Sequence, residues 1–436
     1  MKRTPVVPIL VTAAWGLLAC QESSPTSVDG DLIPVGAQTV EIILPWSVFG
    51  EDVQTYGGFG SPNDLFSQTV AEDFEGTLDS RALTRFSTFP VAVAVQDSLG
   101  ENRTDSSLTY LDGYAVARFD TIRSRVDGPV ELALNFLQQD WHAPSTTWDF
   151  RVDTVQNRDP WPEPGAGPVT PLGSATWDPE AGDSVIFPLD SATLSLFNDT
   201  TGVRPSARLD MVTPGALVEI LGLDLRINTR PSINQDTVVV LSTFPLAETF
   251  VYAPFPEPPE EGIRVGGAPA WRTVLTVDIP TVLNGPESLC ELVGCPFTLD
   301  PNRLNFASLV LTSQASQPVA FQPTDSILLD VRPVLVPERL PKSPLGPSFL
   351  GIAGRAVDPE VFGDDAGAEI SIPVTEFVRT LITPAPDSVT PPPPELAILS
   401  LLEPFSVGFG AFDGPGTAGE PQLRLVLTAV DTVEVR

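Results

Sequence analysis

Apolar and polar residues alternate with a period of two in many segments along this chain, and this pattern limits the folds that it can adopt. Clear examples are YAVARFD (114–120), VELALNF (130–136) and LRLVLTAV (423–430). Successive side chains of a β-strand point to opposite faces of the sheet, so these runs predict strands with one face in a core. The segments between them carry the turn formers of a sequence with 47 Pro and 33 Gly. We therefore expect an all-β fold of antiparallel, jelly-roll-like β-sandwiches.

The strand-like runs form two series that follow a similar order. SVIFPLDSATLSLF (184–197) aligns without a gap with EISIPVTEFVRTLI (369–382), and AVARFDTI (115–122) is matched by TVLTVDIP (273–280). A chain of 436 residues is long enough for two such domains. We interpret the two series as one module present twice. The alternative is that any two β-rich segments look alike at this level.

The amino terminus, MKRTPVVPILVTAAWGLLAC, has a basic start and then an apolar stretch too short to remain across a bilayer. It ends in Leu-Leu-Ala-Cys, which resembles the bacterial lipobox. We predict a signal peptide and lipidation of Cys20, against the alternative of a secretory peptide with an incidental Cys. Gln21 follows, in place of the Asp that favours inner-membrane retention in such signals. The resemblance implies a lipid-anchored protein of the cell envelope, at the outer membrane or cell surface.

These patterns together predict the domain organisation. Residues 1–19 are the expected signal peptide, and 20–36 are polar and acidic, as in a lipidated flexible tether. Residues 37–230 and 231–436 are the two predicted tandem modules. Their boundary is expected in the turn-rich stretch NTRPSINQD.

Two cysteines remain after Cys20, namely Cys290 and Cys295 in CELVGC. In an oxidising exported compartment an even pair at this spacing predicts a local disulfide. The alternative is two free buried thiols. A zinc site is disfavoured because further His or Cys ligands do not occur nearby.

The formal net charge of -32, from 56 acidic and 24 basic residues, limits the partners of the protein. Nucleic-acid backbones are bound by clustered Lys and Arg, so we exclude DNA and RNA. No cofactor is expected. Calcium on the acidic loops, Asp29 with Asp31 or Asp364 and Asp365 with Glu369, is an alternative to plain solvated loops.

A longer pattern of strands and loops resembles a known family. The YAVARFD strand, the apolar VELALNF strand, a Val-Asp-Thr-Val strand, the Trp-containing loops RDPWPEP and ATWDP, and the IFPLD strand look like the DNRLRE-type β-sandwich modules. That family occurs in exported bacterial proteins, and some members are implied to bind polysaccharide. In the second series TVLTVDIP lacks the Arg and the aromatic residue, and a Pro-rich stretch (333–347) replaces the Trp loop. The resemblance therefore implies binding for the first module above all.

Histidine occurs once, as His142 in QDWHAPSTTW, which is expected to be an exposed loop. A serine triad would depend on it, and a multi-histidine metal centre cannot be assembled, so we predict neither catalytic residues nor a metal site. Glycosidases use two carboxylates about 5 to 9.5 Å apart. Among 56 acidic residues such a pair cannot be nominated, and a carbohydrate-active hydrolase is kept as a rival function.

Four tryptophans, Trp141, Trp148, Trp161 and Trp177, fall in loops and strand ends of the first module. Exposed indoles stack on sugar faces, so these are the candidate ligand-binding residues. The competing interpretation is that they fill the core or cover an open sheet edge. The expected function is that of a non-catalytic surface lipoprotein that binds extracellular polymer, polysaccharide above all. A purely structural or adhesive envelope protein is the alternative.

Overall fold

The structure, a computed structural model of the chain, describes residues 38–58, 67–154, 156–198, 204–285, 287–383, 392–403 and 405–429. The predicted signal peptide (1–19), the tether (20–36) and Cys20 lie outside the described residues. Strands dominate and pair antiparallel, so the predicted all-β fold is confirmed. Among the described residues, no helix has the length and apolar character needed to cross a bilayer.

Residues 67–253 form one jelly roll, which we call the central module. Its principal strands in chain order are β3 (Gln68–Phe74), β4 (Leu78–Phe86), β7 (Leu108–Arg125), β8 (Val130–Leu137), β11 (Val169–Trp177), β12 (Ser184–Leu189), β13 (Ser206–Met211) and β14 (Ala216–Pro231). These strands form one continuous sheet in the order β11-β8-β13-β4-β3-β14-β7-β12, in which β3 pairs with β4. We divide it at that pair into two layers, β3-β14-β7-β12 and β4-β13-β8-β11. The first strand thus pairs with the last and the second with the seventh, which is jelly-roll topology.

Smaller elements complete this module. They are β5 (Val93–Gln96), β6 (Asn102–Asp105), β9 (Phe150–Asp153), β10 (Arg158–Pro160), α3 (Ser191–Asn198), β15 (Val239–Thr243) and β16 (Pro245–Ala253). Strand β15 pairs with β14, and β16 pairs with β4. The Asp190 carboxylate accepts a hydrogen bond from the Thr193 backbone N–H at 2.8 Å, which caps the start of α3.

Residues 38–58 and 263–429 form a second jelly roll, which we call the split module. Its principal strands are β1 (Gln38–Pro45), β2 (Gly50–Tyr56), β18 (Arg272–Val277), β21 (Leu304–Gln314), β22 (Ile327–Pro333), β23 (Arg355–Val357), β24 (Glu369–Pro373), β25 (Glu395–Ser400) and β27 (Gln422–Ala429). Its layers have the orders β1-β27-β21-β24 and β2-β18-β25-β22-β23. Strand β2 is an additional edge strand beyond β18, so the eight strands of the jelly roll are β1, β18, β21, β22, β23, β24, β25 and β27. The single turn α2 (Trp46–Phe49) carries the chain from one layer to the other and buries both of its aromatic side chains.

The remaining elements of the split module lie in its connections. They are β17 (Ile263–Val265), β19 (Val282–Leu283), α4 (Glu287–Val293), β20 (Phe297–Thr298), η1 (Val319–Phe321), η2 (Pro337–Arg339), η3 (Pro359–Phe362), α5 (Thr375–Ile382) and β26 (Gly410–Phe412).

The two modules share their topology, although not every predicted match joins equivalent strands. Segments 184–197 and 369–382 both form the sixth strand of a jelly roll followed by an eight-residue helix, β12 with α3 and β24 with α5. By contrast, 115–122 lies in the third strand β7, whereas 273–280 begins in the second strand β18. That match is wrong, because period-two alternation does not distinguish one half-buried strand from the next.

The sheets do not follow the predicted boundaries of 37–230 and 231–436. Strand β1 pairs with β27 from Gln38 opposite Ala429 onward, so the first described strands belong with the last one. Strands β15 and β16 lie beyond residue 230, yet they pair within the central module. The central module is therefore inserted between β2 and β18 of the split module. Two strands pair when their hydrogen-bonding edges meet in space. The order of the strands along the chain does not show which edges meet.

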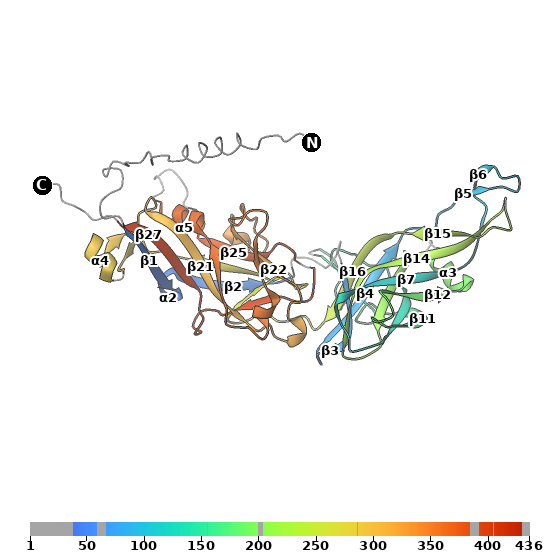
Figure 1. The fold of residues 1–436 in the computed structure, drawn as a ribbon, viewed down its shortest axis with the longest axis horizontal. Coiled ribbons are helices and arrows are strands. Elements are labelled where there is room, and N and C mark those ends of the chain that lie inside the picture. Colours follow the sequence, from blue (N-terminus) through green and yellow to red (C-terminus); the bar gives the residue numbers. More distant parts are fainter. Residues whose placement is uncertain are drawn as a thin grey trace, which may run out of the picture.

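The modules lie end to end and share an apolar joint (Figure 1). Each has its own core between its layers. A third cluster combines Phe250 and Tyr252 of the central module with Trp271 and Phe321 of the split module. Across the same joint, Arg123 Nε lies 3.0 Å from Asp325 Oδ2. Burial of these aromatic side chains fixes one module against the other.

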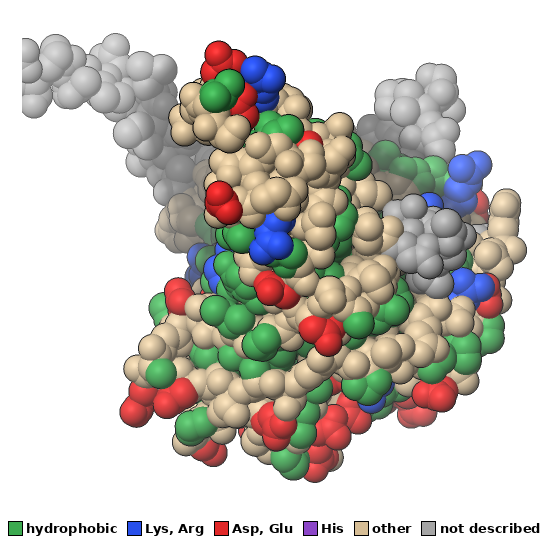
Figure 2. All heavy atoms as spheres, turned by 90° about the vertical axis from the view of Figure 1, so that its right-hand side faces the viewer, with side chains coloured by type: hydrophobic (Ala, Val, Ile, Leu, Met, Phe, Trp, Pro, Cys, Tyr) green, Lys and Arg blue, Asp and Glu red, His purple; other side chains and the backbone are tan. Residues whose placement is uncertain are grey.

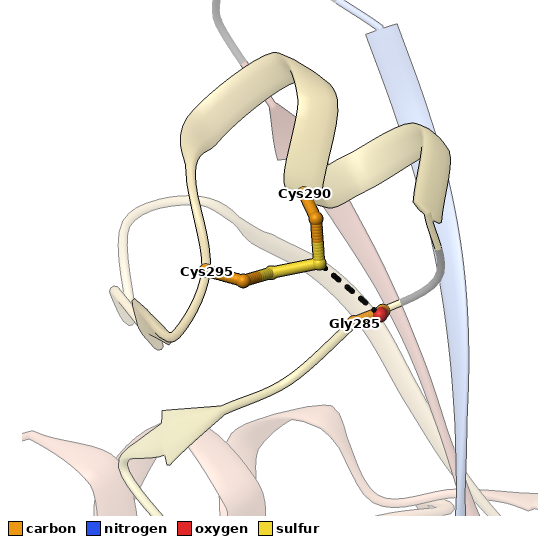
Figure 3. Close-up of a disulfide and its surroundings, with 3 residues drawn as sticks. All are labelled: Gly285, Cys290 and Cys295. Atoms are coloured by element: carbon orange, nitrogen blue, oxygen red, sulfur yellow. Dashed lines mark hydrogen bonds between the residues drawn. A yellow bond between two sulfur atoms is a disulfide. The ribbon is translucent and has the colours of Figure 1, made fainter.

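The predicted Cys290–Cys295 disulfide is present, with the two Cα atoms 4.9 Å apart. Figure 3 shows that it ties α4 to the turn that follows, with Cys290 Sγ 3.3 Å from the carbonyl oxygen of Gly285. The bridge therefore closes a local loop on the split module.

Candidate functional site

A cavity of about 570 Å³ opens beside the joint between the modules. Such a volume is in the range of roughly 300 to 1,000 Å³ typical of small-ligand sites. Its walls come from residues 144–158 of the central module, from the end of β16 and the linker after it, and from Gly58 and Ala268 of the split module. Both modules are thus needed to form it.

One wall carries aromatic rings that are each backed by an arginine. Arg81 lies 4.7 Å from the ring centroid of Trp148, and Arg158 lies 4.2 Å from that of Phe150. Arg158 Nε also lies 2.8 Å from Asp153 Oδ1. These contacts place a cation beside each ring and pair the Asp153 carboxylate with Arg158, so this wall is partly apolar.

A second part of the lining is built by Tyr252 and Phe255, whose rings stack with centroids 6.1 Å apart and an interplanar angle of 24°. Phe255 remains 50% exposed, whereas Tyr252 is 8% exposed. Burial raises the pKa of the Tyr252 hydroxyl. That hydroxyl has no hydrogen-bond partner among the described residues, although an unpaired buried polar group costs about 1 to 3 kcal/mol.

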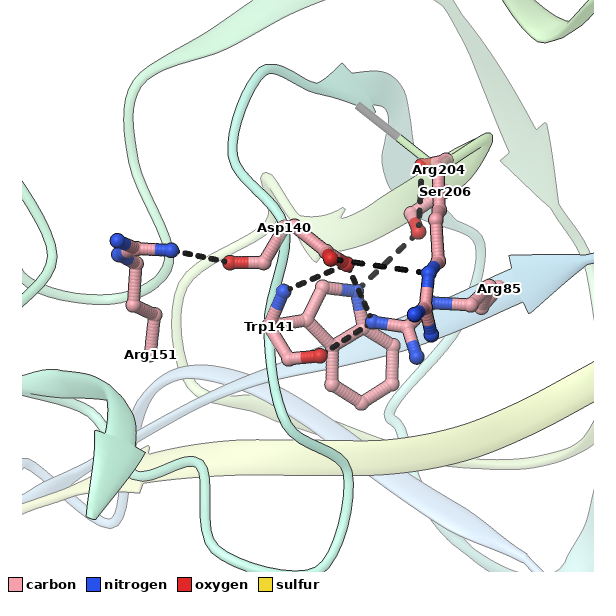
Figure 4. A network of polar contacts seen from close by, with 6 residues as sticks. All are labelled: Arg85, Asp140, Trp141, Arg151, Arg204 and Ser206. Carbon is pink, nitrogen blue, oxygen red and sulfur yellow. Dashed lines mark hydrogen bonds and ion pairs between the residues drawn. The ribbon is translucent and has the colours of Figure 1, made fainter. Parts of the chain in front are cut away.

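The first wall belongs to residues 138–168, which have little regular structure and pack on the outer face of the β4-β13-β8 sheet. Trp141 is their main anchor (Figure 4). Its Nε1 donates to Ser206 Oγ at 3.2 Å, and the Arg85 guanidinium lies 4.5 Å from its ring centroid. Asp140 accepts hydrogen bonds from the Trp141 backbone N–H at 3.0 Å and from Arg85 at 2.8 Å. Figure 4 also shows Arg151 donating to the Asp140 carbonyl oxygen, which ties the segment to itself.

The four candidate tryptophans do not form one binding platform. Trp141, Trp161 and Trp177 are only 3%, 4% and 1% exposed, so they cannot offer a ring face to a ligand. Trp177 lies in the sandwich core against Phe119, and its Nε1 donates to the Gly182 carbonyl oxygen at 2.9 Å. Only Trp148 lines the cavity. The nomination of the other three is wrong, because burying a large ring stabilises the fold more than exposing it.

His142 is exposed, as predicted, and its Nδ1 lies 2.8 Å from Ser145 Oγ. A serine nucleophile needs a base that a third group orients, and among the described residues no carboxylate is paired with His142. The described residues also contain no group of three or more His, Cys, Asp or Glu placed to hold a metal, Asp364, Asp365 and Glu369 included. Asp29 and Asp31 lie outside the described residues.

A second, smaller cavity of about 100 Å³ lies in the joint and contains Glu219. Thr69 Oγ1 donates to Glu219 Oε1 at 2.7 Å. Burial raises the pKa of the Glu219 carboxyl, and hydrogen bonds from Thr69 and Ser67 offset part of that rise. The side chain is enclosed between the modules, so it belongs to the joint and not to an open site.

Sequence reasoning missed Phe150, Tyr252, Phe255 and Asp149 as lining residues. Phe150 and Asp149 lie close to Trp148 in sequence, so the flagged tryptophan loop was a usable signal for them. Tyr252 and Phe255 come from β16 and the Pro-rich linker, and nothing in their sequence indicates that they face residues 144–158.

Comparisons with known proteins do not identify the chain. No family model and no curated protein matches it. Among solved structures, it is matched to a chain titled BspA_C_WT with 8% identity over 90% of this chain and 91% of that chain, at a TM-score of 0.09. The Streptococcus agalactiae AgI/II polypeptide BspA C terminal domain (WT) gives 8% identity, 90% and 92% coverage and the same TM-score. Likeness at that level carries no argument about fold or function.

Proposed function

We propose that this chain is a non-catalytic lipoprotein of the bacterial cell envelope, anchored through Cys20, that binds an extracellular polysaccharide in the cavity between its two modules. The observation that carries the proposal is the cavity itself, with Trp148 and Phe255 as ring faces and Asp149 and Asp153 as hydrogen-bond acceptors. Sugar rings present both apolar C–H faces and hydroxyl groups. A cavity with aromatic walls and a few polar groups matches both.

The position of the cavity also supports this role. The described chain begins at Gln38, which pairs with Ala429 at the end of β27. Figure 1 shows this end of the split module turned away from the central module. A lipid attached ahead of Gln38 would place the split module between the membrane and the joint, so that the cavity is held away from the membrane surface.

The proposal is tested by isothermal titration of the mature protein with soluble polysaccharides. Trp148→Ala is expected to weaken binding by at least about tenfold, which corresponds to about 1.4 kcal/mol and is within the range of a stacked aromatic anchor. Phe244→Ala is the matched control, because Phe244 is 70% exposed and does not line the cavity. It should bind as tightly as the unchanged protein.

Two results would contradict the proposal. Equal loss in both variants, or none in either, would place any binding elsewhere on the surface. Failure of the unchanged protein to bind any polysaccharide would favour the structural or adhesive envelope role.

A further inference from the structure

The charges that line the cavity are predominantly negative. Asp149 and Asp153 line it, and Arg158 is the one cationic lining residue among those described. Arg158 already has partners within the protein, because its Nε lies 2.8 Å from Asp153 Oδ1 and its guanidinium lies over the Phe150 ring. Within the described residues Asp149 forms no ion pair, so the lining keeps a net negative charge.

Arg81 packs against the Trp148 ring and also has a hydrogen-bond partner within the protein. It is 4.7 Å from the Trp148 ring centroid, and its Nη1 donates to the Gly165 carbonyl oxygen at 2.6 Å. Arg81 does not line the cavity, and the charge of Arg158 is paired with the lining carboxylate of Asp153, so neither arginine gives the lining an excess of positive charge.

The net charge of the whole molecule also disfavours binding of anionic ligands. The net charge is -32, and an anionic polymer that approaches the cavity meets this field at low ionic strength. Figure 2 looks onto the free end of the central module and shows acidic side chains along its lower rim, among hydrophobic ones and with fewer Lys and Arg. Acidic polysaccharides are thus repelled both at long range and inside the cavity.

We infer that the ligand is a neutral glycan and not a uronate or sulfated one. In this arrangement sugar hydroxyls donate hydrogen bonds to the Asp149 and Asp153 carboxylates, while the apolar face of a sugar ring lies on Trp148. Carboxylates accept hydrogen bonds and cannot donate them when ionised, so they select hydroxyl groups over anionic groups. This inference rests on the proposed function.

The test compares probes that differ mainly in charge. Dextran, mannan, xylan and galactan serve as neutral probes, and dextran sulfate, polygalacturonate and alginate serve as anionic ones. In the unchanged protein, binding that Trp148→Ala abolishes is expected only for neutral probes. It should also persist at high salt, because it does not depend on long-range charge.

Asp149→Lys provides the decisive variant, and Asp149→Asn its milder counterpart. Asp149 is exposed, so neither change disturbs the core. Asp149→Lys should strengthen binding of anionic probes by about three- to tenfold at low salt, because it replaces a repulsive charge with an attractive one. Affinity for a neutral probe should fall, because Lys cannot accept a hydrogen bond from a sugar hydroxyl.

The outcomes separate the inference from the proposed function. Anionic probes that bind more tightly than neutral ones, with loss in Trp148→Ala, would overturn the inference and leave the cavity as the binding site. Absence of any Trp148-dependent binding would overturn both.

Discussion

At the residue scale, a single carboxyl group on the split module couples stability to pH. Glu403 is 7% exposed at its side chain, and its Oε1 lies 2.5 Å from Arg272 Nε. Burial raises the pKa of the Glu403 carboxyl from 4.5 to about 7, and Arg272 offsets only part of that rise. Removal from water thus outweighs the pairing with a single cation.

We predict that this group makes the protein less stable as the pH rises from about 4.5 to above 7. In that window the folded state keeps a proton that the unfolded state has lost, so the stabilisation present at low pH disappears as pH passes the folded pKa. The change amounts to about 3 kcal/mol. Glu403→Gln should flatten this part of the profile of unfolding free energy against pH, measured by urea denaturation.

The matched control is Glu257→Gln, which removes an exposed carboxylate from the linker. Its pH profile should follow that of the unchanged protein. If Glu403→Gln and Glu257→Gln gave the same profile, the buried carboxyl would not be the titrating group.

At the element scale, residues 138–168 form a cavity wall with few backbone ladders of their own, in which β9 and β10 pair only with each other. Side-chain packing therefore holds this segment in place, whereas backbone hydrogen bonds hold the strands of the sheets. Trp141 and Trp161 pack with Leu83, Leu137 and Val251 on the outer face of the β4-β13-β8 sheet. This satellite core positions Trp148, which itself stays half-buried.

We predict that Trp141→Ala destabilises the protein by about 3 to 5 kcal/mol, because it empties a buried ring site and unpairs the hydrogen bonds around it. Trp148→Ala should cost only about 1 kcal/mol, mostly the lost contact with Arg81. Urea denaturation monitored by circular dichroism measures both. Similar losses in the two variants would mean that Trp141 is not the anchor.

At the scale of the whole molecule, one jelly roll is inserted into another. The split module closes only when β1 and β2 join strands from the far end of the chain. Arg424 and Glu41, for example, lie 2.6 Å apart across a separation of 383 residues. The central module has all of its strands within 67–253 and a core of its own.

We predict that residues 67–253 fold alone, whereas a chain that starts at residue 59 retains only the central module as a cooperative unit. Loss of β1, α2 and β2 removes Ile42, Trp46 and Phe49 from the core of the split module. Urea unfolding and limited proteolysis measure this directly. An unchanged unfolding profile for the shortened chain would contradict the insertion.

A point variant provides the matched control for that deletion. Ile42→Asp places a charge on the buried face of β1, whereas Ile43→Asp changes its exposed face. The first should reproduce the loss of the split module and the second should not.

Elements whose formation depends on neighbouring residues could be predicted from the sequence. Alternation over 114–120, 130–136 and 423–430 predicted the strands β7, β8 and β27, because half-burial imposes a period of two on any such strand. The Cys290–Cys295 bridge was equally local, since both thiols lie in one short loop.

The pairing of the strands and the position of the cavity, by contrast, follow from contacts between residues that are distant in sequence. The hydrogen-bonding edges of strands are chemically alike, so nothing in the sequence distinguishes β27 from β2 as the partner of β1. Likewise, the residues next to Trp148 and Trp177 in the sequence do not predict that the first lines the cavity and the second lies in the core. The burial of each ring depends on which distant residues pack against it. The candidate site combines segments from both modules, and its chemistry exists only once the joint has brought them together.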